Sequence, residues 1–341
     1  MAIVAAAALA ACGGGSDSTS TTQTTTGVKA NTVPVADAGS PQSLVAGSKV
    51  SLSAAASSDA DGDKLTYAWT LTSKPDGSTA TLSDAAAVAP TFVADAPGTY
   101  VASLVVNDGK ASSPAVSVTI TASATVAFDS LSPMPPNMPS YGPEAYSFSS
   151  LGDRILLKAG SPLTLDTVSV GMSSWACESG DWTNACSTTP NATFNQDITL
   201  HVYDSAGNLV GTRTQTFAIP YRPSPDSNCT GTDAGKWQAA DGKCYNGKAT
   251  KITFNLRTLG ITLPDEMMSY DVSFNTNTHG PSPIGHTGPY DSLNIGAYFA
   301  PTLPSVGVNV DPGLTLVSGS LANLWNESPD VMAQVTTINK Q

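Results

Sequence analysis

The sequence predicts an all-β chain that folds as two consecutive sandwich domains. Charged residues make up only 12% of the chain, whereas Gly (29) and Pro (24) are plentiful, which is typical of short strands joined by turns. Short segments in which apolar and polar residues alternate recur between turn signals along the chain. With 341 residues, the chain is also long enough for two separate hydrophobic cores.

The first domain is predicted over residues 31–123, a unit without cysteine. Alternation predicts its strands at 49–53, 65–72, 100–106 and 115–121. In the second of these strands we expect Trp69 to fill the core and Tyr67 to lie on the opposite face.

Two stretches of this unit carry a family resemblance. They read PVADAGSPQSLVAGSKVSLSAAASSDADGDKLTYAWTL and PTFVADAPGTYVASLVVNDGKASSP. With their acidic turn at 59–63, the Tyr67-Ala68-Trp69 triplet and Gly98-Thr99-Tyr100, they resemble the PKD (polycystic-kidney-disease-type) repeat of bacterial surface proteins. The resemblance implies an immunoglobulin-like sandwich without a disulfide. Independently of the family, Tyr100 resembles a tyrosine corner, in which the tyrosine hydroxyl bonds back to the backbone.

The acidic turn reads D-x-D-G-D at Asp59, Asp61 and Asp63, like the beginning of a calcium loop. An EF-hand needs a bidentate Glu at position 12, and Thr70 occupies that position here. This excludes an EF-hand. The alternatives are a weak Ca²⁺ site and a plain acidic turn in which Gly62 supplies a positive φ. No other cofactor is predicted.

Residues 124–140 are rich in proline and are predicted to be an extended, semi-rigid linker. The second domain, residues 141–341, is predicted to be a larger, jelly-roll-like sandwich. Its expected strands lie at 154–158, 165–172, 198–203, 209–219, 250–256, 270–275, 293–298 and 331–338. Residues 204–208 are expected to close a hairpin, and 321–325 to form a short helix.

Four cysteines lie in the second domain: Cys177, Cys186, Cys229 and Cys244. Four cysteines allow three connectivities, and the pairs Cys177–Cys186 and Cys229–Cys244 are favoured because they close the shortest loops. A zinc site is the alternative, although CxxC spacing is missing and an exported protein favours disulfides.

Four aromatic residues surround these cysteines: Trp175, Trp182, Trp237 and Tyr245. Aromatic side chains on disulfide-stapled loops can form a rigid platform on which sugar rings stack. The four residues are therefore candidates for ligand binding. The alternative is that they are plugs packed against the disulfides.

No catalytic residue is assigned. A mononuclear metal site from His279, His286 and Asp291 matches no strong ligand spacing, and solvated loop histidines are the alternative. A glycosidase would need paired carboxylates, for which Glu178 is one candidate, and a nucleophile elbow G-x-S-x-G is missing from the sequence.

The N-terminal run MAIVAAAALAA is followed by Cys12. It is too short to span a bilayer and fits the apolar region of a signal peptide. Leu9-Ala10-Ala11-Cys12 resembles the lipobox of bacterial lipoproteins, which implies lipidation of Cys12, although no Lys or Arg precedes the run as in that family. An ordinary signal peptide with an unmodified Cys12 is the alternative. Residues 1–12 are thus a predicted signal and 13–30 a flexible Ser/Thr-rich tether.

The net charge of −12 and the isoelectric point near 4.4 argue against nucleic acid as a partner, because phosphate binding needs clustered Lys and Arg. The sequence favours a noncatalytic cell-surface lipoprotein for recognition or adhesion, with a glycan or protein ligand. Its lipid would attach it to the cell envelope, and Gly13 resembles the signal of lipoproteins sent to the outer membrane. The alternatives are a secreted carbohydrate-active or peptide hydrolase with a PKD accessory domain, and a purely structural envelope protein.

Overall fold

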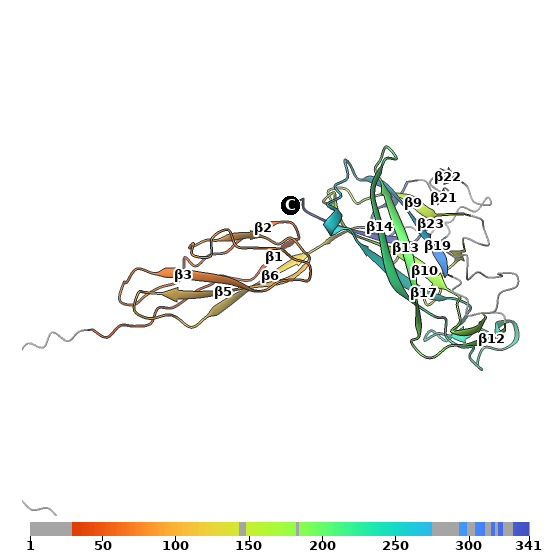
Figure 1. Cartoon of the computed structure of the whole chain (residues 1–341), viewed down its shortest axis with the longest axis horizontal. Coiled ribbons are helices and arrows are strands. Elements are labelled where there is room, and N and C mark those ends of the chain that lie inside the picture. The colour runs from red at the N-terminus through yellow and green to blue at the C-terminus, as the bar shows by residue number, and fades with distance from the viewer. Residues whose placement is uncertain are drawn as a thin grey trace, which may run out of the picture.

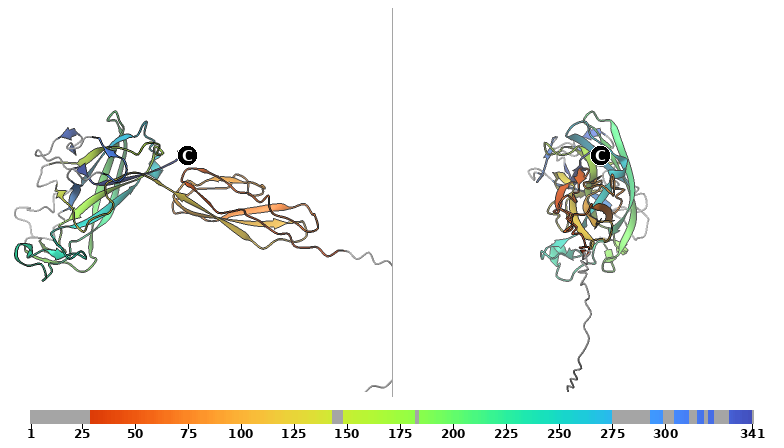
Figure 2. Two further views of the ribbon diagram at one scale, coloured as in Figure 1. Left: turned by 180° about the vertical axis from the view of Figure 1, so that it is seen from behind. Right: turned by 90° about the vertical axis from the view of Figure 1, so that its left-hand side faces the viewer.

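The computed structural model describes residues 29–142, 148–181, 184–274, 293–298, 304–310, 315–317, 320–322 and 330–340. These residues form β-strands and two short 3₁₀ helices, and no α-helix is among them. The all-β prediction is therefore confirmed. Two bodies lie end to end, and the C-terminal end of the chain lies at their junction (Figures 1 and 2). No helix in the described part of the chain is long and apolar enough to cross a membrane.

The first domain is a sandwich of two sheets. Its strands are β1 (Gln42–Val45), β2 (Lys49–Ser51), β3 (Thr66–Ser73), β4 (Thr91–Val93), β5 (Gly98–Asn107) and β6 (Val116–Ser123). Within the described residues, one sheet has the order β1-β6-β5-β3, with β1 parallel to β6, and the other pairs β2 with β4. The alternating burial of β5 and β6 places every second side chain in one core between the two sheets.

Two aromatic residues on β3 share one face of the strand. Trp69 is 3% exposed and lies in the core, as predicted. The prediction for Tyr67 was wrong, because this residue is half-buried and packs against the same core. Residues two positions apart in a strand point to the same face, so Tyr67 follows Trp69 inward.

Tyr100 forms the tyrosine corner. Its hydroxyl accepts a hydrogen bond from the Ala96 amide at 2.8 Å and lies 2.9 Å from a carboxylate oxygen of Asp95. Tyr100 is completely buried, and Asp95 is also buried. The corner therefore ties the loop before β5 to the core and satisfies two buried polar groups at once.

The second domain is a larger two-sheet sandwich. Its elements, in chain order, are β7 (Thr125–Asp129), β8 (Ser140–Tyr141), β9 (Leu151–Leu156), β10 (Thr164–Ser174), β11 (Ser179–Asp181), β12 (Asn184–Ser187), β13 (Thr193–Tyr203), β14 (Leu209–Pro220), η1 (Gly231–Asp233), β15 (Trp237–Gln238), β16 (Cys244–Tyr245), β17 (Lys248–Asn255), η2 (Arg257–Leu259), β18 (Met267–Phe274), β19 (Leu293–Tyr298), β20 (Val308–Asn309), β21 (Thr315–Val317), β22 (Ser320–Ala322), β23 (Asp330–Val331) and β24 (Ala333–Ile338).

Two sheets enclose the core of this domain. The first, which we call the covered sheet, has the order β23-β19-β10-β24-β7 in the described residues, with β17 beside β10 and β8 beside β19. The second, the open sheet, has the order β14-β13-β18-β9-β21-β22, with β20 beside β9. The predicted hairpin at 204–208 joins β13 to β14, whereas the predicted helix at 321–325 is wrong where it is described, because residues 321 and 322 belong to β22.

The Pro-rich segment packs on the outer face of the covered sheet. Its Leu131 and Met138 are buried, at 2% and 3% exposure. They fit because Gly171 on β10 and Gly296 on β19 carry no side chains: a Cβ on Gly296 would lie 2.0 Å from the Met138 sulfur. This explains why β10 is buried on both of its faces.

The predicted linker at 124–140 is therefore wrong. Ala124 alone separates β6 from β7, and β7 is a strand of the covered sheet, where it pairs with β24. In the other direction, β24 runs back toward the first domain. Ile338, at the end of β24, is 1% exposed and belongs to the core of the first domain. Proline-rich composition indicates a stiff local chain, but it does not report what that chain packs against.

Tyr100→Phe is expected to destabilise the protein by about 1–3 kcal/mol, because it leaves the buried Ala96 amide without an acceptor. Urea denaturation would measure this loss. Tyr67→Phe is the matched control, since the Tyr67 hydroxyl makes no hydrogen bond to the described residues, and its change should stay within about 0.5 kcal/mol. Equal effects of the two variants would contradict the role of the corner.

Candidate ligand-binding surfaces

The four cysteines form the two local disulfides that were favoured. Cys177, two residues before β11, is bonded to Cys186 on β12, with Cα atoms 5.5 Å apart. Cys229 is bonded to Cys244 on β16, with Cα atoms 5.9 Å apart. Both Cα separations are usual for disulfides. The two loops are further joined by Arg222, which sequence reasoning missed. Its backbone amide donates to Ala176 and its guanidinium to the Gly235 carbonyl at 2.7 Å.

The Trp237 side chain is buried between these loops. It is 5% exposed, and its indole nitrogen donates to the Gly247 carbonyl at 2.9 Å. The Lys248 ammonium lies 5.0 Å from its ring centre, which is a cation–π distance. The prediction that Trp237 offers its ring to a ligand is wrong, because burial and this hydrogen bond occupy both its ring and its polar atom.

The other aromatic residues are only partly accessible. Trp175 is half-buried, and its indole nitrogen lies 3.2 Å from the Ser173 hydroxyl. Tyr245 is half-buried, stands 5.9 Å from the Trp237 ring and donates to Asp241 at 2.6 Å, a hydrogen bond that raises the pKa of Tyr245. Trp182 lies outside the described residues. The structure thus brings Trp237 and Tyr245 together as internal packing and not as a flat platform.

The residues considered for catalysis are not assembled into a site in the described part of the chain. Glu178 is exposed, and its carboxylate accepts the Thr189 amide at 2.6 Å, a bond that lowers the pKa of Glu178. His279, His286 and Asp291 lie outside the described residues.

The acidic turn does gather its three carboxylates. One oxygen from each of Asp59, Asp61 and Asp63 lies within 4.8 Å of the others. Two of the three already have cationic partners, since Lys29 lies 2.5 Å from Asp61 and Lys110 lies 2.7 Å from Asp63. Each lysine contacts one oxygen of its carboxylate. The weak Ca²⁺ site at this turn stays a prediction.

A cluster that sequence reasoning missed lies on the outer face of the open sheet. His201 on β13 and Asp271 on β18 are register partners, and the His201 Nδ1 atom lies 2.7 Å from Asp271 Oδ1. The Tyr203 hydroxyl donates to Asp271 Oδ2 at 3.1 Å. The strands at 198–203 and 270–275 were predicted, but nothing in the sequence indicates that they are neighbours.

The three side chains of this cluster differ in exposure. The Asp271 side chain is 1% exposed, whereas the His201 side chain is 28% exposed. Burial, followed by the negative charge of Asp271 and the hydrogen bond to it, raises the pKa of Tyr203 to about 12. Tyr203 therefore stays protonated and remains a donor across the physiological range. We refer to His201, Tyr203 and Asp271 as the His201 cluster.

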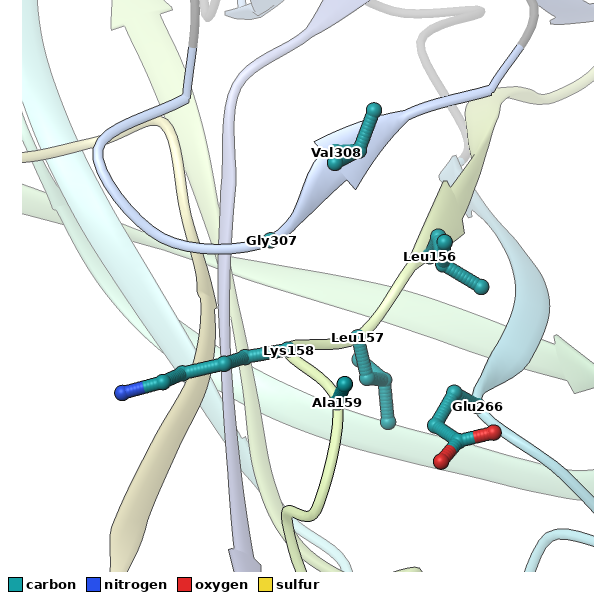
Figure 3. A pocket seen from close by; sticks show the side chains of 7 residues that line it. All are labelled: Leu156, Leu157, Lys158, Ala159, Glu266, Gly307 and Val308. Carbon is teal, nitrogen blue, oxygen red and sulfur yellow. The ribbon is translucent and has the colours of Figure 1, made fainter.

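A recess of about 440 Å³ opens at the end of β9. Figure 3 shows the aliphatic side chains of Leu156, Leu157 and Val308 around it, with the Glu266 carboxylate nearby and Lys158 pointing away from them. Ligand sites usually combine an apolar pocket with several convergent polar groups. This recess has one carboxylate near its wall, so the His201 cluster is the better candidate site.

Comparisons with known proteins place the first domain. Residues 31–126 match the family model of the PKD domain, so this immunoglobulin-like sandwich is a PKD domain, as the resemblance implied. A solution structure of the PKD domain from the KIAA 1837 protein is 28% identical and covers 28% of this chain and 90% of that chain, with a TM-score of 0.24. No curated protein matches the chain.

Two further solved structures are similar to this chain, one over about a quarter of it and one over most of it. A nucleoside hydrolase-related hypothetical protein from Saccharophagus degradans, associated with carbohydrate metabolism, is 25% identical with a TM-score of 0.25. The match covers 27% of this chain and 26% of that one, so this chain spans about a quarter of its length. A carbohydrate-binding module of the β-sandwich superfamily is 12% identical and covers 91% of this chain and 98% of that chain, with a TM-score of 0.24.

Lys29→Ala is expected to raise the pKa of Asp61 from about 2 toward its ordinary value of 3.8, because the hydrogen bond from Lys29 is the largest cause of the lowered pKa. The folded-state pKa is depressed, so the contacts of Asp61 stabilise the fold above the unfolded-state pKa and are lost as the pH falls toward 2. A carboxyl NMR titration would measure the shift. Lys110→Ala, which removes the partner of Asp63, should leave the Asp61 pKa low, and an unchanged pKa in Lys29→Ala would contradict this explanation.

Proposed function

We propose that this chain is a noncatalytic recognition protein of the cell surface, which presents a ligand-binding sandwich at the end of a stiff PKD arm. The observation that carries the proposal is the junction of the two domains. The chain crosses the junction twice. It enters the sandwich from β6 into β7, which Ala124 alone separates, and it returns along β24, which pairs antiparallel with β7. Recognition requires a binding surface held in a defined place, and such a junction provides it.

The junction is fixed by contacts between the PKD domain and the C-terminal end of β24 with the residue that follows it. Ile338 packs in the PKD core. The Asn339 amide donates to the Ala46 carbonyl at 2.8 Å, and the Asn339 side chain donates to the Ser48 hydroxyl at 2.7 Å. Gly47 lies between them with φ +85°, and a Cβ there would come within 2.0 Å of the Asn339 carbonyl oxygen. Apolar burial and hydrogen bonds together oppose bending at this point.

The described chain enters the PKD domain at the end far from the sandwich (Figure 1). There, Lys29 pairs with Asp61, and the Asn31 side chain donates to Asp108 at 2.8 Å. In our proposal the lipid on Cys12 attaches the chain to the outer membrane, facing the periplasm or the cell exterior. The PKD arm then separates the sandwich from that membrane by its full length.

The two disulfides support export. Disulfides persist in oxidising compartments and are rare in the cytosol, and both staple loops of the sandwich. The ligand would be a glycan or a protein, since the net charge of −12 disfavours nucleic acid and other polyanions. The surface for it is the outer face of the open sheet, because the Pro-rich segment occupies the outer face of the covered sheet.

Gly47→Ala is expected to uncouple the two domains, because the new methyl group would collide with the Asn339 backbone. Small-angle X-ray scattering should show a broader distribution of shapes, and ¹⁵N relaxation should give the two domains different tumbling times. Gly77→Ala is the matched control: Gly77 has φ +74° with nothing within 4 Å, so it carries only the backbone cost of about 1–2 kcal/mol.

Asn339→Ala is a milder variant, which removes one hydrogen bond across the junction and keeps the backbone bond. If wild-type scattering already requires independently moving domains, or if Gly47→Ala scatters as the wild type does, the stiff arm is refuted.

Cys12→Ser is expected to release the protein from membranes into the soluble fraction, because it removes the thiol that would carry the lipid. Mass spectrometry of the wild-type N-terminus should find Cys12 as the first residue, with lipid attached. An unlipidated N-terminus at another residue would contradict the anchor and leave a secreted protein.

A further inference from the structure

The His201 cluster lies where the fold does not need a buried carboxylate. Met268, Tyr270 and Val272 on β18 point into the core and are completely buried, so Asp271 between them faces outward. The outer face of β13 and β14 around it carries polar residues, among them Thr199 and Thr214. A threonine at position 271 would suit this surface as well, whereas burying a carboxylate costs free energy unless its oxygens are bonded.

Both oxygens of Asp271 are bonded, one by His201 and one by Tyr203. A carboxylate is a hydrogen-bond acceptor, so the Nδ1 atom of His201 carries the proton that the bond uses. The ring orientation is then fixed and the Nε2 atom is the remaining polar atom of the imidazole. Within the described residues no group bonds to that atom. The arrangement holds an imidazole ready for an external partner.

The surroundings of the two rings are rich in hydroxyl groups. In the strand register, Thr212 on β14 stands beside His201, and Ser269 on β18 stands beside Tyr203. Thr199 and Thr214 hydrogen-bond to each other at 2.8 Å on the same face. Ring surfaces offer apolar contact to the C–H faces of sugars, and neighbouring hydroxyl groups can donate to or accept from sugar hydroxyls.

We propose that the His201 cluster is the centre of a binding site for a neutral, hydroxyl-rich glycan. This inference rests on the proposed function of the chain as a recognition protein and assigns it a site and a ligand class. The imidazole Nε2 atom would bond a sugar hydroxyl, and the Tyr203 and His201 rings would border the sugar. A neutral glycan is favoured over an acidic one because the chain carries a net charge of −12.

The test is binding of the full chain to an array of neutral oligosaccharides, uronic-acid oligosaccharides and extracellular proteins, followed by calorimetry with the best-bound oligosaccharide. Asp271→Asn should weaken neutral glycan binding about tenfold or more, since a hydrogen bond to a charged group is lost and the ring is no longer held. His201→Gln should weaken it similarly. Tyr203→Phe, which keeps the ring and loses only the hydroxyl, should have a smaller effect.

Asp197→Asn is the matched control. Asp197 lies on the same strand as His201 and is exposed, and among the described residues its carboxylate accepts a hydrogen bond only from the Thr216 hydroxyl. This variant therefore removes one negative charge outside the cluster and should bind as the wild type does. Thermal unfolding of every variant separates loss of the site from loss of the fold. If the Asp271→Asn variant is unfolded, glycan binding by the His201→Gln and Tyr203→Phe variants still tests the site, because His201 is more exposed than Asp271.

The outcomes distinguish the site from the function. Neutral glycan binding that all three cluster variants retain overturns the site but leaves the proposed function. Binding of proteins alone, or of uronic-acid oligosaccharides alone, overturns the ligand class and also leaves that function. Failure of the wild type to bind any member of the array overturns both, as does shortening of the bound oligosaccharide, which would make the chain a hydrolase.

Discussion

The structure depends most on β24, the strand that belongs to both domains. It pairs with β10 on one side and with β7 on the other, so its backbone is held within the covered sheet. Its inward side chains fill the sandwich core at Ala333 and Val335 and then the PKD core at Ile338. One rigid segment that supplies side chains to two cores fixes the position of those cores relative to each other, because the strand cannot shift in one without losing its register in the other.

The covered sheet has its outer face occupied, which is why we propose the outer face of the open sheet for a ligand. β10 contributes to the core through one face and accepts Leu131 and Met138 on its other face, where Gly171 leaves room. The disulfide loops likewise turn Trp237 inward. Trp237, which the sequence offers as a binding residue, is thus used for packing, and the outer face of the open sheet presents a polar cluster instead.

Three of the described carboxylates accept hydrogen bonds or ion pairs from specific neighbours. Asp95 receives the Tyr100 hydroxyl, Asp61 receives Lys29, and Asp271 receives His201 and Tyr203. The PKD pairs serve stability, since they fasten a loop and the entering chain to the fold. The His201 cluster in the sandwich differs because the His201 imidazole is partly exposed on a sheet face. For this reason we connect this cluster with recognition.

By itself, the sequence determined the longer strands, the PKD domain, the hairpin at 204–208 and the two disulfides, because alternation, turn residues and short loops are properties of neighbouring residues. The prediction that Tyr67 faces away from Trp69 was wrong, although the two-residue period of a strand already places both residues on the same face. The tertiary structure alone decided that 124–140 is not a linker and that Trp237 is buried. It alone also brought His201 to Asp271 across a separation of 70 residues. These features depend on which distant strands pair and what covers each sheet, and no local pattern encodes that choice.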